Sequence, residues 1–260
     1  MTRALELVAH ETVEALAGSV EQDGFAYMPA VLDAADVAEL RSRIDVLEPD
    51  PQAFDRRSAS DKHIKVVFNR DAFFLRFLDQ APVVDVAEAT LGADCHIIGM
   101  TAWMTGSGRP DQRLHADYLP LELAEDLLVG GRARVPVFVA TAHYYLNDMY
   151  EALGPTKFVL GSHRSGRKPR EGERSWRDRE ERSVLCAAGD VLLFRSDVWH
   201  RGSANTSAET RYLLQVHYAQ RMIAQKFPPY LRFRFNQRIL AQANPRQRRL
   251  LGEHEPANYD

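Results

Sequence analysis

A chain of 260 residues with 45% hydrophobic and 27% charged residues has the composition of an ordinary globular protein, and it is long enough to bury one substantial core without disulfides. Its two cysteines, Cys95 and Cys186, lie in separate apolar stretches, which argues against a disulfide scaffold or a cysteine-ligated metal site and favours a reducing, cytoplasmic compartment. The net charge is −3, and the chain has neither a glycine-rich phosphate loop nor a basic and aromatic nucleic-acid signature, so we expect no nucleic-acid partner.

Charge is unevenly distributed along the chain. Residues 1–50 hold eleven acids and three bases, whereas residues 221–250 hold eight bases and no acid. Such asymmetry is compatible with an anionic partner or substrate. Because these bases alternate with apolar residues, we favour complementary faces of one fold or a subunit contact, which leaves a homodimer open. The N-terminus lacks the apolar core of a secretion signal, and no run approaches the roughly 18 apolar residues of a spanning helix, so we expect a soluble protein without a membrane partner.

The first part of the chain, about residues 1–92, predicts helices. Val13, Leu16 and Val20 follow a helical spacing that Gly24 ends, and residues 25–32 look extended. Asp33 is placed to cap a second helix over residues 34–48. A further helical pair is expected within residues 71–92.

From about residue 95 to 220 the pattern changes to short β-rich runs separated by Gly, Pro, Asp, Asn and Ser. The runs cover residues 95–105, 113–119, 135–146, 156–162, 183–196, 198–203 and 211–219. This punctuation favours a β-sandwich or barrel over an alternating α/β sheet. Residues 162–182 are polar and aperiodic and predict a mobile surface loop, while about residues 227–260 return to a helical spacing. The whole is expected to be a single domain.

His115 and Asp117 are the first candidate site residues. Residues two apart on a strand point to the same face, so an imidazole and a carboxylate can enter one cavity. A His-x-acid triplet is expected about once by chance in this composition, so the pair carries weight only with other residues.

His200 and Arg211 supply those other residues. Two neutral imidazoles and one carboxylate that leave coordination positions open make the facial triad suited to non-haem Fe(II). Arg211, eleven residues beyond His200 at the start of a strand, offers a planar, bidentate partner to a carboxylate.

Four ordered phrases carry a resemblance to a known family. They are Gln-x-x-His-x-Asp (112–117), Gly-Pro-x-x-x-x-x-Gly-Ser-His (154–163), Gly-Asp-Val-x-x-Phe (189–194) and Trp-His-x-x-x-x-Asn (199–205) followed by Arg211. Together they cover roughly residues 20–225. In these phrases the chain resembles the phytanoyl-CoA dioxygenase-like branch of the iron- and 2-oxoglutarate-dependent oxygenases.

The resemblance implies a mainly β fold, a double-stranded β-helix or jelly roll with helices packed outside it. It further implies that His115, Asp117 and His200 ligate Fe(II) and that Arg211 binds the distal carboxylate of 2-oxoglutarate. The usual chemistry consumes O2 and 2-oxoglutarate, releases succinate and CO2, and takes hydrogen from an unactivated C–H bond of a small molecule. Family members that halogenate lack the carboxylate ligand, so Asp117 argues against halogenation.

Other residues of the motifs have weaker assignments. Gln112 is either a hydrogen-bond partner of co-substrate or substrate, or a solvent-facing residue. Many relatives have Ser or Thr two places after the second histidine, where this chain has Gly202, so Ser203 becomes the candidate hydroxyl for 2-oxoglutarate. Thr141 is a further candidate, because Thr141, His143 and Tyr145 share one strand face that we expect to line the cavity.

If Arg211 points inward, strand alternation sends Leu213, Gln215 and His217 the same way. His163 matches a family phrase, but we expect a structural role for it.

We therefore interpret the chain as a hydroxylase, or as an enzyme that oxidises a C–H bond with another outcome, such as desaturation, ring closure or epimerisation. A secondary metabolite is among the candidate substrates.

Two rival interpretations use the same fold. A redox-inert hydrolase or isomerase could hold zinc on the same three ligands, but it would have no use for Arg211 at its spacing. A non-catalytic jelly-roll binding module would have no physical need for three convergent ligands.

Overall fold

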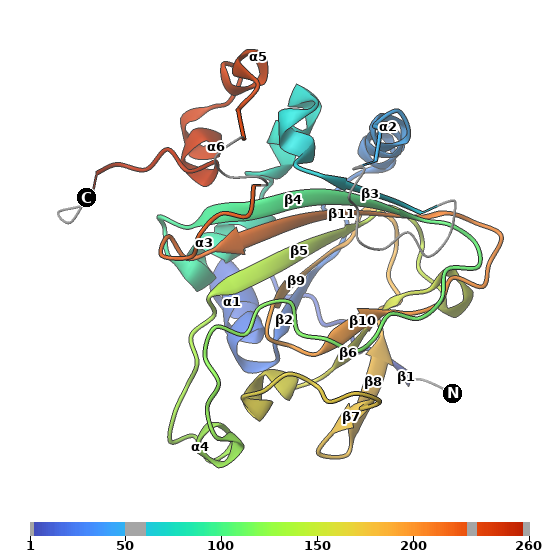
Figure 1. Ribbon diagram of the computed structural model, residues 1–260, viewed down its shortest axis with the longest axis vertical. Helices are drawn as coiled ribbons and strands as arrows, with labels where there is room; N and C mark the ends of the chain where they lie inside the picture. The colour runs from blue at the N-terminus through green and yellow to red at the C-terminus, as the bar shows by residue number, and fades with distance from the viewer. Residues whose placement is uncertain (1–2, 50–60, 228–232, 257–260) are drawn as a thin grey trace.

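The computed structural model describes residues 3–49, 61–227 and 233–256, and two β-sheets dominate it (Figure 1). The larger sheet has the strand order β2-β9-β5-β11-β4-β3, and all its neighbours are antiparallel. Its strands are β2 (Phe25–Met28), β3 (Lys62–Lys65), β4 (His96–Thr105), β5 (Val139–Tyr145), β9 (Val191–Arg195) and β11 (Arg211–Ala219). The smaller sheet has the order β1-β8-β6-β10, with β7 paired to β8. Its strands are β1 (Arg3–Ala4), β6 (Thr156–Val159), β7 (Ser175–Trp176), β8 (Arg179–Ser183) and β10 (His200–Gly202). The two sheets form the jelly-roll core that the sequence motifs imply.

Helices cover the outer face of the larger sheet (Figure 1). The α-helices are α1 (Val13–Gln22), α2 (Ala34–Asp45), α3 (Val83–Leu91), α4 (Glu125–Val129), α5 (Gln237–Leu240) and α6 (Pro245–Leu250). The 3-10 helices are η1 (Val67–Asn69), η2 (Ala72–Phe77), η3 (Glu151–Leu153) and η4 (Ser162–Ser165). The even-numbered residues of β5 and β11 bury their side chains against α1 and α3, so the odd-numbered residues face the smaller sheet.

The first N-terminal helix ends just before the predicted glycine, and the second begins where the sequence predicts but ends at Asp45, three residues earlier than expected. The Asp33 side chain accepts a hydrogen bond from the Asp36 amide at 2.8 Å and caps α2. Gly24 follows α1 with a φ of 98°, and a Cβ there would lie 2.6 Å from Val198 Cγ2. A glycine is therefore required both by the backbone conformation and by the close approach of Val198.

The helical pair expected in residues 71–92 is present as the 3-10 helix η2 and the α-helix α3. Two other local predictions were wrong. Residues 113–119 form no strand and contribute one isolated β-bridge, between His115 and His200. The segment 162–182 holds η4 and the β7–β8 hairpin, because Trp176 is buried and the Arg167 guanidinium forms a bidentate pair with Glu173. The polar sequence gave no sign of this ordered structure, because its charged side chains pair with one another locally.

The basic C-terminal tail packs against the helical layer. Arg246 of α6 contacts both Asp85 and Glu88 of α3 at 2.7 Å, and Arg249 also pairs with Glu88. The interpretation of complementary faces within one fold is confirmed for this segment, although its acidic partner is α3 and not the N-terminal fifty residues. Within the described ranges no helix is long and apolar enough to cross a membrane.

Candidate metal centre

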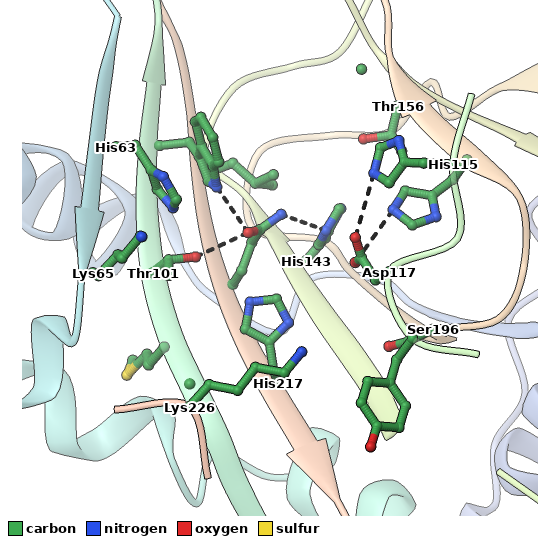
Figure 2. A pocket seen from close by; sticks show the side chains of 18 of the residues that line it. His63, Lys65, Thr101, His115, Asp117, His143, Thr156, Ser196, His217 and Lys226 are labelled. Atoms are coloured by element: carbon green, nitrogen blue, oxygen red, sulfur yellow. Dashed lines mark hydrogen bonds and ion pairs between the residues drawn. The ribbon is translucent and has the colours of Figure 1, made fainter. Parts of the chain in front are cut away.

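Three side chains from two separate segments converge at one point between the sheets (Figure 2). His200 begins β10, and His115 and Asp117 lie on the extended segment that runs beside it. The His115 amide donates to the His200 carbonyl at 3.0 Å, and the His200 amide donates to the His115 carbonyl at 2.8 Å. This reciprocal bridge holds the two imidazoles on one side, and the three ligand atoms lie within 4.8 Å of one another.

Both imidazoles are oriented by the backbone. Nδ1 of His115 lies 2.8 Å from the Arg113 carbonyl, and Nδ1 of His200 lies 2.9 Å from the Val198 carbonyl. A carbonyl can only accept, so each Nδ1 carries the proton and each Nε2 presents a lone pair. Outer-sphere contacts of this kind are typical of metal-binding histidines.

Asp117 lies between the two lone pairs. Its Oδ1 is 3.4 Å from His115 Nε2, and its Oδ2 is 3.5 Å from His200 Nε2. Burial raises the pKa of the Asp117 carboxyl, but in the metal-free site His200 and His115, when each also carries a proton on Nε2, outweigh burial and hold the pKa well below its usual range. Ligand atoms bound to one metal ion at about 2.1 Å lie about 3 Å apart, so the donor set fits a divalent ion with small side-chain movements.

The triad opens into a cavity of about 480 Å³ between the two sheets, a volume ordinary for a small-molecule site. Arg211, Leu213, Gln215 and His217 of β11 all line it, as strand alternation predicts. His143 of β5 lines it as well (Figure 2). The inner face of the larger sheet is therefore one wall, and the triad stands on the opposite side.

Arg211 is buried in the cavity wall with unused hydrogen-bonding capacity. Its Nη1 donates to the Gly154 carbonyl and its Nη2 donates to Thr105 Oγ1 at 3.2 Å. Its Nε has no hydrogen-bond partner among the described residues. Burial lowers the pKa of the guanidinium to about 10, which still leaves it charged at neutral pH. A buried cation with a free N–H donor fits a carboxylate ligand.

Gln112 lies beside Arg211 and interacts with Gly202. The Gly202 amide donates to Gln112 Oε1 at 2.8 Å. A Cβ at Gly202 would stand 3.0 Å from that oxygen and 3.5 Å from Arg211 Nη2. The glycine that replaces the family's usual Ser or Thr thus makes room for the Gln112 amide, and Gln112 faces the cavity.

Two predicted co-substrate contacts are not supported by the geometry. Ser203 Oγ donates to the Pro155 carbonyl at 2.6 Å, and Ser203 is not among the cavity-lining residues. Thr141 points inward, as expected, but it too is absent from the cavity lining, because its hydroxyl is held between Ser196 Oγ and His217 Nδ1. Both hydroxyls have protein partners that a sequence pattern cannot reveal.

The structure adds cavity residues that the motifs did not indicate. Arg109 is buried near Arg211 and pairs with Asp61 at 3.4 Å. Lys226 comes from the chain after β11, and His63 and Lys65 come from β3. No local pattern marks these residues, because strand pairing and chain reversal bring them to the site.

Comparisons with known proteins agree with this architecture. The family model for phytanoyl-CoA dioxygenase matches residues 20–212. The chain is 24% identical over 215 residues to the uncharacterised protein Rv1501 of Mycobacterium tuberculosis, covering 78% of this chain and 74% of that protein. The matched region contains the segments that carry His115, Asp117 and His200. The chain belongs to the phytanoyl-CoA dioxygenase family.

Solved structures show the same fold at low sequence identity. The non-haem α-ketoglutarate-dependent epimerase SnoN from nogalamycin biosynthesis superposes with a TM-score of 0.65 at 20% identity, covering 85% of this chain and 89% of that one. HygX from Streptomyces hygroscopicus, with nickel and 2-oxoglutarate bound, gives 0.65 at 16% identity, covering 81% and 88%. The carbocyclase SnoK gives 0.62 at 16% identity, covering 88% and 95%.

Proposed function

We propose that the protein is an Fe(II)- and 2-oxoglutarate-dependent oxygenase that oxidises a C–H bond of a small organic molecule. The observation that carries the proposal is one cavity containing both a triad of His115, Asp117 and His200 and a buried Arg211 with an unpartnered N–H. Family membership supports the proposal, as do the cofactors named for HygX and the two nogalamycin enzymes.

The roles of the side chains follow from their geometry. His115, Asp117 and His200 would hold the iron on one side and leave the cavity side open. Arg211 would bind the distal carboxylate of 2-oxoglutarate, with Gln112 close to it. Iron with 2-oxoglutarate and O2 supplies the oxidising power that amino-acid side chains lack. The protein then positions the substrate C–H bond and keeps bulk water out through the apolar wall that includes Leu213 and Met100.

Hydroxylation is the simplest outcome, and the products would be the hydroxylated molecule, succinate and CO2. SnoN is an epimerase and SnoK is a carbocyclase with the same fold, so the proposal includes epimerisation and ring closure as alternatives to hydroxylation. Anaerobic addition of Fe(II) and 2-oxoglutarate should give the weak visible charge-transfer band of the chelate, and succinate should form in air. If neither appears, the proposal is wrong, and substrate turnover that continues without O2 would favour a redox-inert metal enzyme.

Arg211→Ala is the sharper test. We expect the 2-oxoglutarate affinity of the Ni(II)-loaded protein to fall by about 10- to 100-fold, the usual size of a lost charge-assisted hydrogen bond. Nickel affinity should stay close to that of the wild type, because no contact of the triad involves Arg211. Both affinities are measured by titration calorimetry. Arg113→Ala is the control, since its side chain is 83% exposed. Equal loss of metal and co-substrate in Arg211→Ala would contradict the assigned role.

A further inference from the structure

The inward side chains of β11 divide the cavity into two ends. Inward neighbours on a strand are about 6.6 Å apart, so Arg211 and His217 are separated by about 20 Å. Between them, Gln215 bonds to His143 at 2.7 Å, and Figure 2 shows His143 extending toward Asp117. The triad therefore lies level with the middle of β11. If 2-oxoglutarate spans Arg211 and the metal, the primary substrate must occupy the His217 end.

Lys226 is the charged group at the His217 end. Its amide donates to the Ile98 carbonyl at 2.8 Å, which places the residue beside the start of β4. Its ammonium lies 5.0 Å from the centre of the Tyr118 ring, and Figure 2 shows it extending beside His217. Lys226 is a solvent-exposed residue at this end of the cavity, and among the described residues its ammonium forms no ion pair with a carboxylate. Lys226 thus presents an unpaired charge to the cavity and is held by an aromatic face.

His217 adds a polar group without a charge. Its Nδ1 bonds to Thr141 Oγ1 at 3.0 Å, which leaves Nε2 directed to the cavity side. Burial lowers the pKa of His217 to about 4, so the imidazole is neutral at pH 7. Lys226 and His217 together resemble a site for one negatively charged group.

Apart from Lys226, the charged groups that line the cavity are balanced once the proposed metal ion and 2-oxoglutarate are bound. Among the described lining residues Asp117 is the sole carboxylate. A divalent ion and Arg211 are neutralised by Asp117 and the doubly charged 2-oxoglutarate, and Arg109 pairs with Asp61. Lys65 also faces the cavity, but it has an interaction of its own, so its charge is not free. The charge of Lys226 remains uncompensated.

Ile98, Met100 and Val139 give this end apolar surface, and Ser196 adds a hydroxyl that is bonded to Thr141. We propose that the primary substrate is a predominantly apolar molecule with one anionic group, a carboxylate by chemical class, and that Lys226 binds this group. A single uncompensated cation matches a monoanion. The inference rests on the proposed function, because that function assigns Arg211 to the co-substrate and leaves the His217 end to the substrate.

The test uses protein loaded with Ni(II) and saturated with 2-oxoglutarate, so that Arg211 is occupied. Titration calorimetry compares two carboxylates with their neutral amides: naphthalene-2-carboxylate with naphthalene-2-carboxamide, and 4-phenylbutanoate with 4-phenylbutanamide. We expect at least one acid to bind about 10-fold or more tightly than its amide. Lys226→Met should remove this preference without changing the affinity for the amide, and Lys226→Arg should retain it. Lys168→Met, at an exposed lysine outside the cavity, should behave as the wild type.

Three results would overturn the inference. The first is that neither acid binds more tightly than its amide, and the second is that the preference for the acid survives in Lys226→Met. The third is that Lys226→Met lowers the affinity for 2-oxoglutarate as strongly as the affinity for the acid. The last result would place Lys226 in the co-substrate site and leave the proposed function intact. Conversely, wild-type protein that binds no 2-oxoglutarate would refute the proposed function, and the acid and amide comparison would then be made with Ni(II) alone.

Discussion

At the scale of single residues, Gly154 holds the arginine of the cavity in place. Its φ is +80°, and a Cβ there would lie 2.6 Å from the Ser203 carbonyl oxygen and 2.8 Å from that of Ala204. Its own carbonyl accepts the hydrogen bond from Arg211 Nη1. The backbone conformation, the packing and the position of the guanidinium therefore all depend on the absence of a side chain.

Gly154→Ala should lower both stability and co-substrate affinity. The positive φ alone costs about 1–2 kcal/mol, and the two carbonyl contacts add to it, so we expect a loss of about 2–4 kcal/mol in urea unfolding. Gly172→Ala is the matched control, because Gly172 has a φ of +78° and a Cβ added there would meet no neighbouring group within 4 Å. An equal loss in both variants would mean that the contacts with Ser203 and Ala204 contribute nothing.

Sequence reasoning found the residues that lie in motifs and missed the others. The spacing of His115, Asp117 and His200 indicated the triad, and strand alternation indicated Gln215 and His217. Lys226 and Arg109 could not be found in this way, because they reach the cavity through chain reversals whose geometry no local pattern encodes. The same limit explains Ser203, whose hydroxyl bonds to a carbonyl 48 residues away.

At the scale of elements, Arg201 joins three segments beside the metal centre. Its Nε and Nη2 donate to the Glu181 carboxylate of β8 at 2.7 and 2.8 Å, and its Nη1 donates to Asp111. Asp111 also accepts from the Ala204 amide at 2.9 Å. Arg201 and Glu181 are buried, and Asp111 is exposed. Because Arg201 follows His200 directly and Asp111 precedes Gln112, this cluster aligns the two segments that carry the candidate ligands.

Glu181→Leu should destabilise the protein by about 3 kcal/mol, because it leaves a buried guanidinium without its main partner. Asp111 still pairs with Arg201, which keeps the cost near the lower end for a broken buried pair. Adding Arg201→Met should recover part of the loss in urea unfolding. The exposed pair Arg113–Glu171 is the comparison, and its removal should cost less than about 1 kcal/mol. A double variant as unstable as Glu181→Leu would show that the charge was not the cause.

The elements themselves were predictable where short β-rich runs are separated by turn residues. β4, β5 and β11 are such runs, although all residues of β5 are buried and the pairing of β4 with β11 contains a register shift. The segment that carries His115 and Asp117 is not a regular strand: it has one isolated β-bridge to β10 and separate backbone hydrogen bonds from Gln112 to Gly202 and from Tyr118 to Ser196. The β7–β8 hairpin was missed because Trp176 is its one buried apolar side chain and arginines and glutamates surround it.

At the scale of the whole molecule, several histidines are kept neutral inside the fold. Burial lowers the pKa of His163 to about 2, that of His217 to about 4 and that of His143 well below its usual value. Below pH 6.5 the unfolded chain binds protons at these sites and the folded chain does not. Stability is therefore lost as the pH falls through the window between 6.5 and the folded pKa values.

Unfolding free energy should thus decrease between pH 7 and pH 5, with His163 contributing up to about 2 kcal/mol of the loss. His163→Gln should flatten this dependence, as measured by urea unfolding at several pH values. His10→Gln, at an exposed position, should leave the dependence unchanged. An identical pH profile in His163→Gln and the wild type would contradict the assignment.

The bridge between His115 and His200 also constrains the order of events when the chain folds. The two bridge residues are far apart in the sequence, so closing the chain between them carries a large entropic cost that the barrel strands must first offset. The ligands consequently meet only after the sheets have formed, and the metal ion cannot nucleate folding as zinc does in a zinc finger. An ion bound by these residues would therefore be loaded late, onto a scaffold that is already assembled.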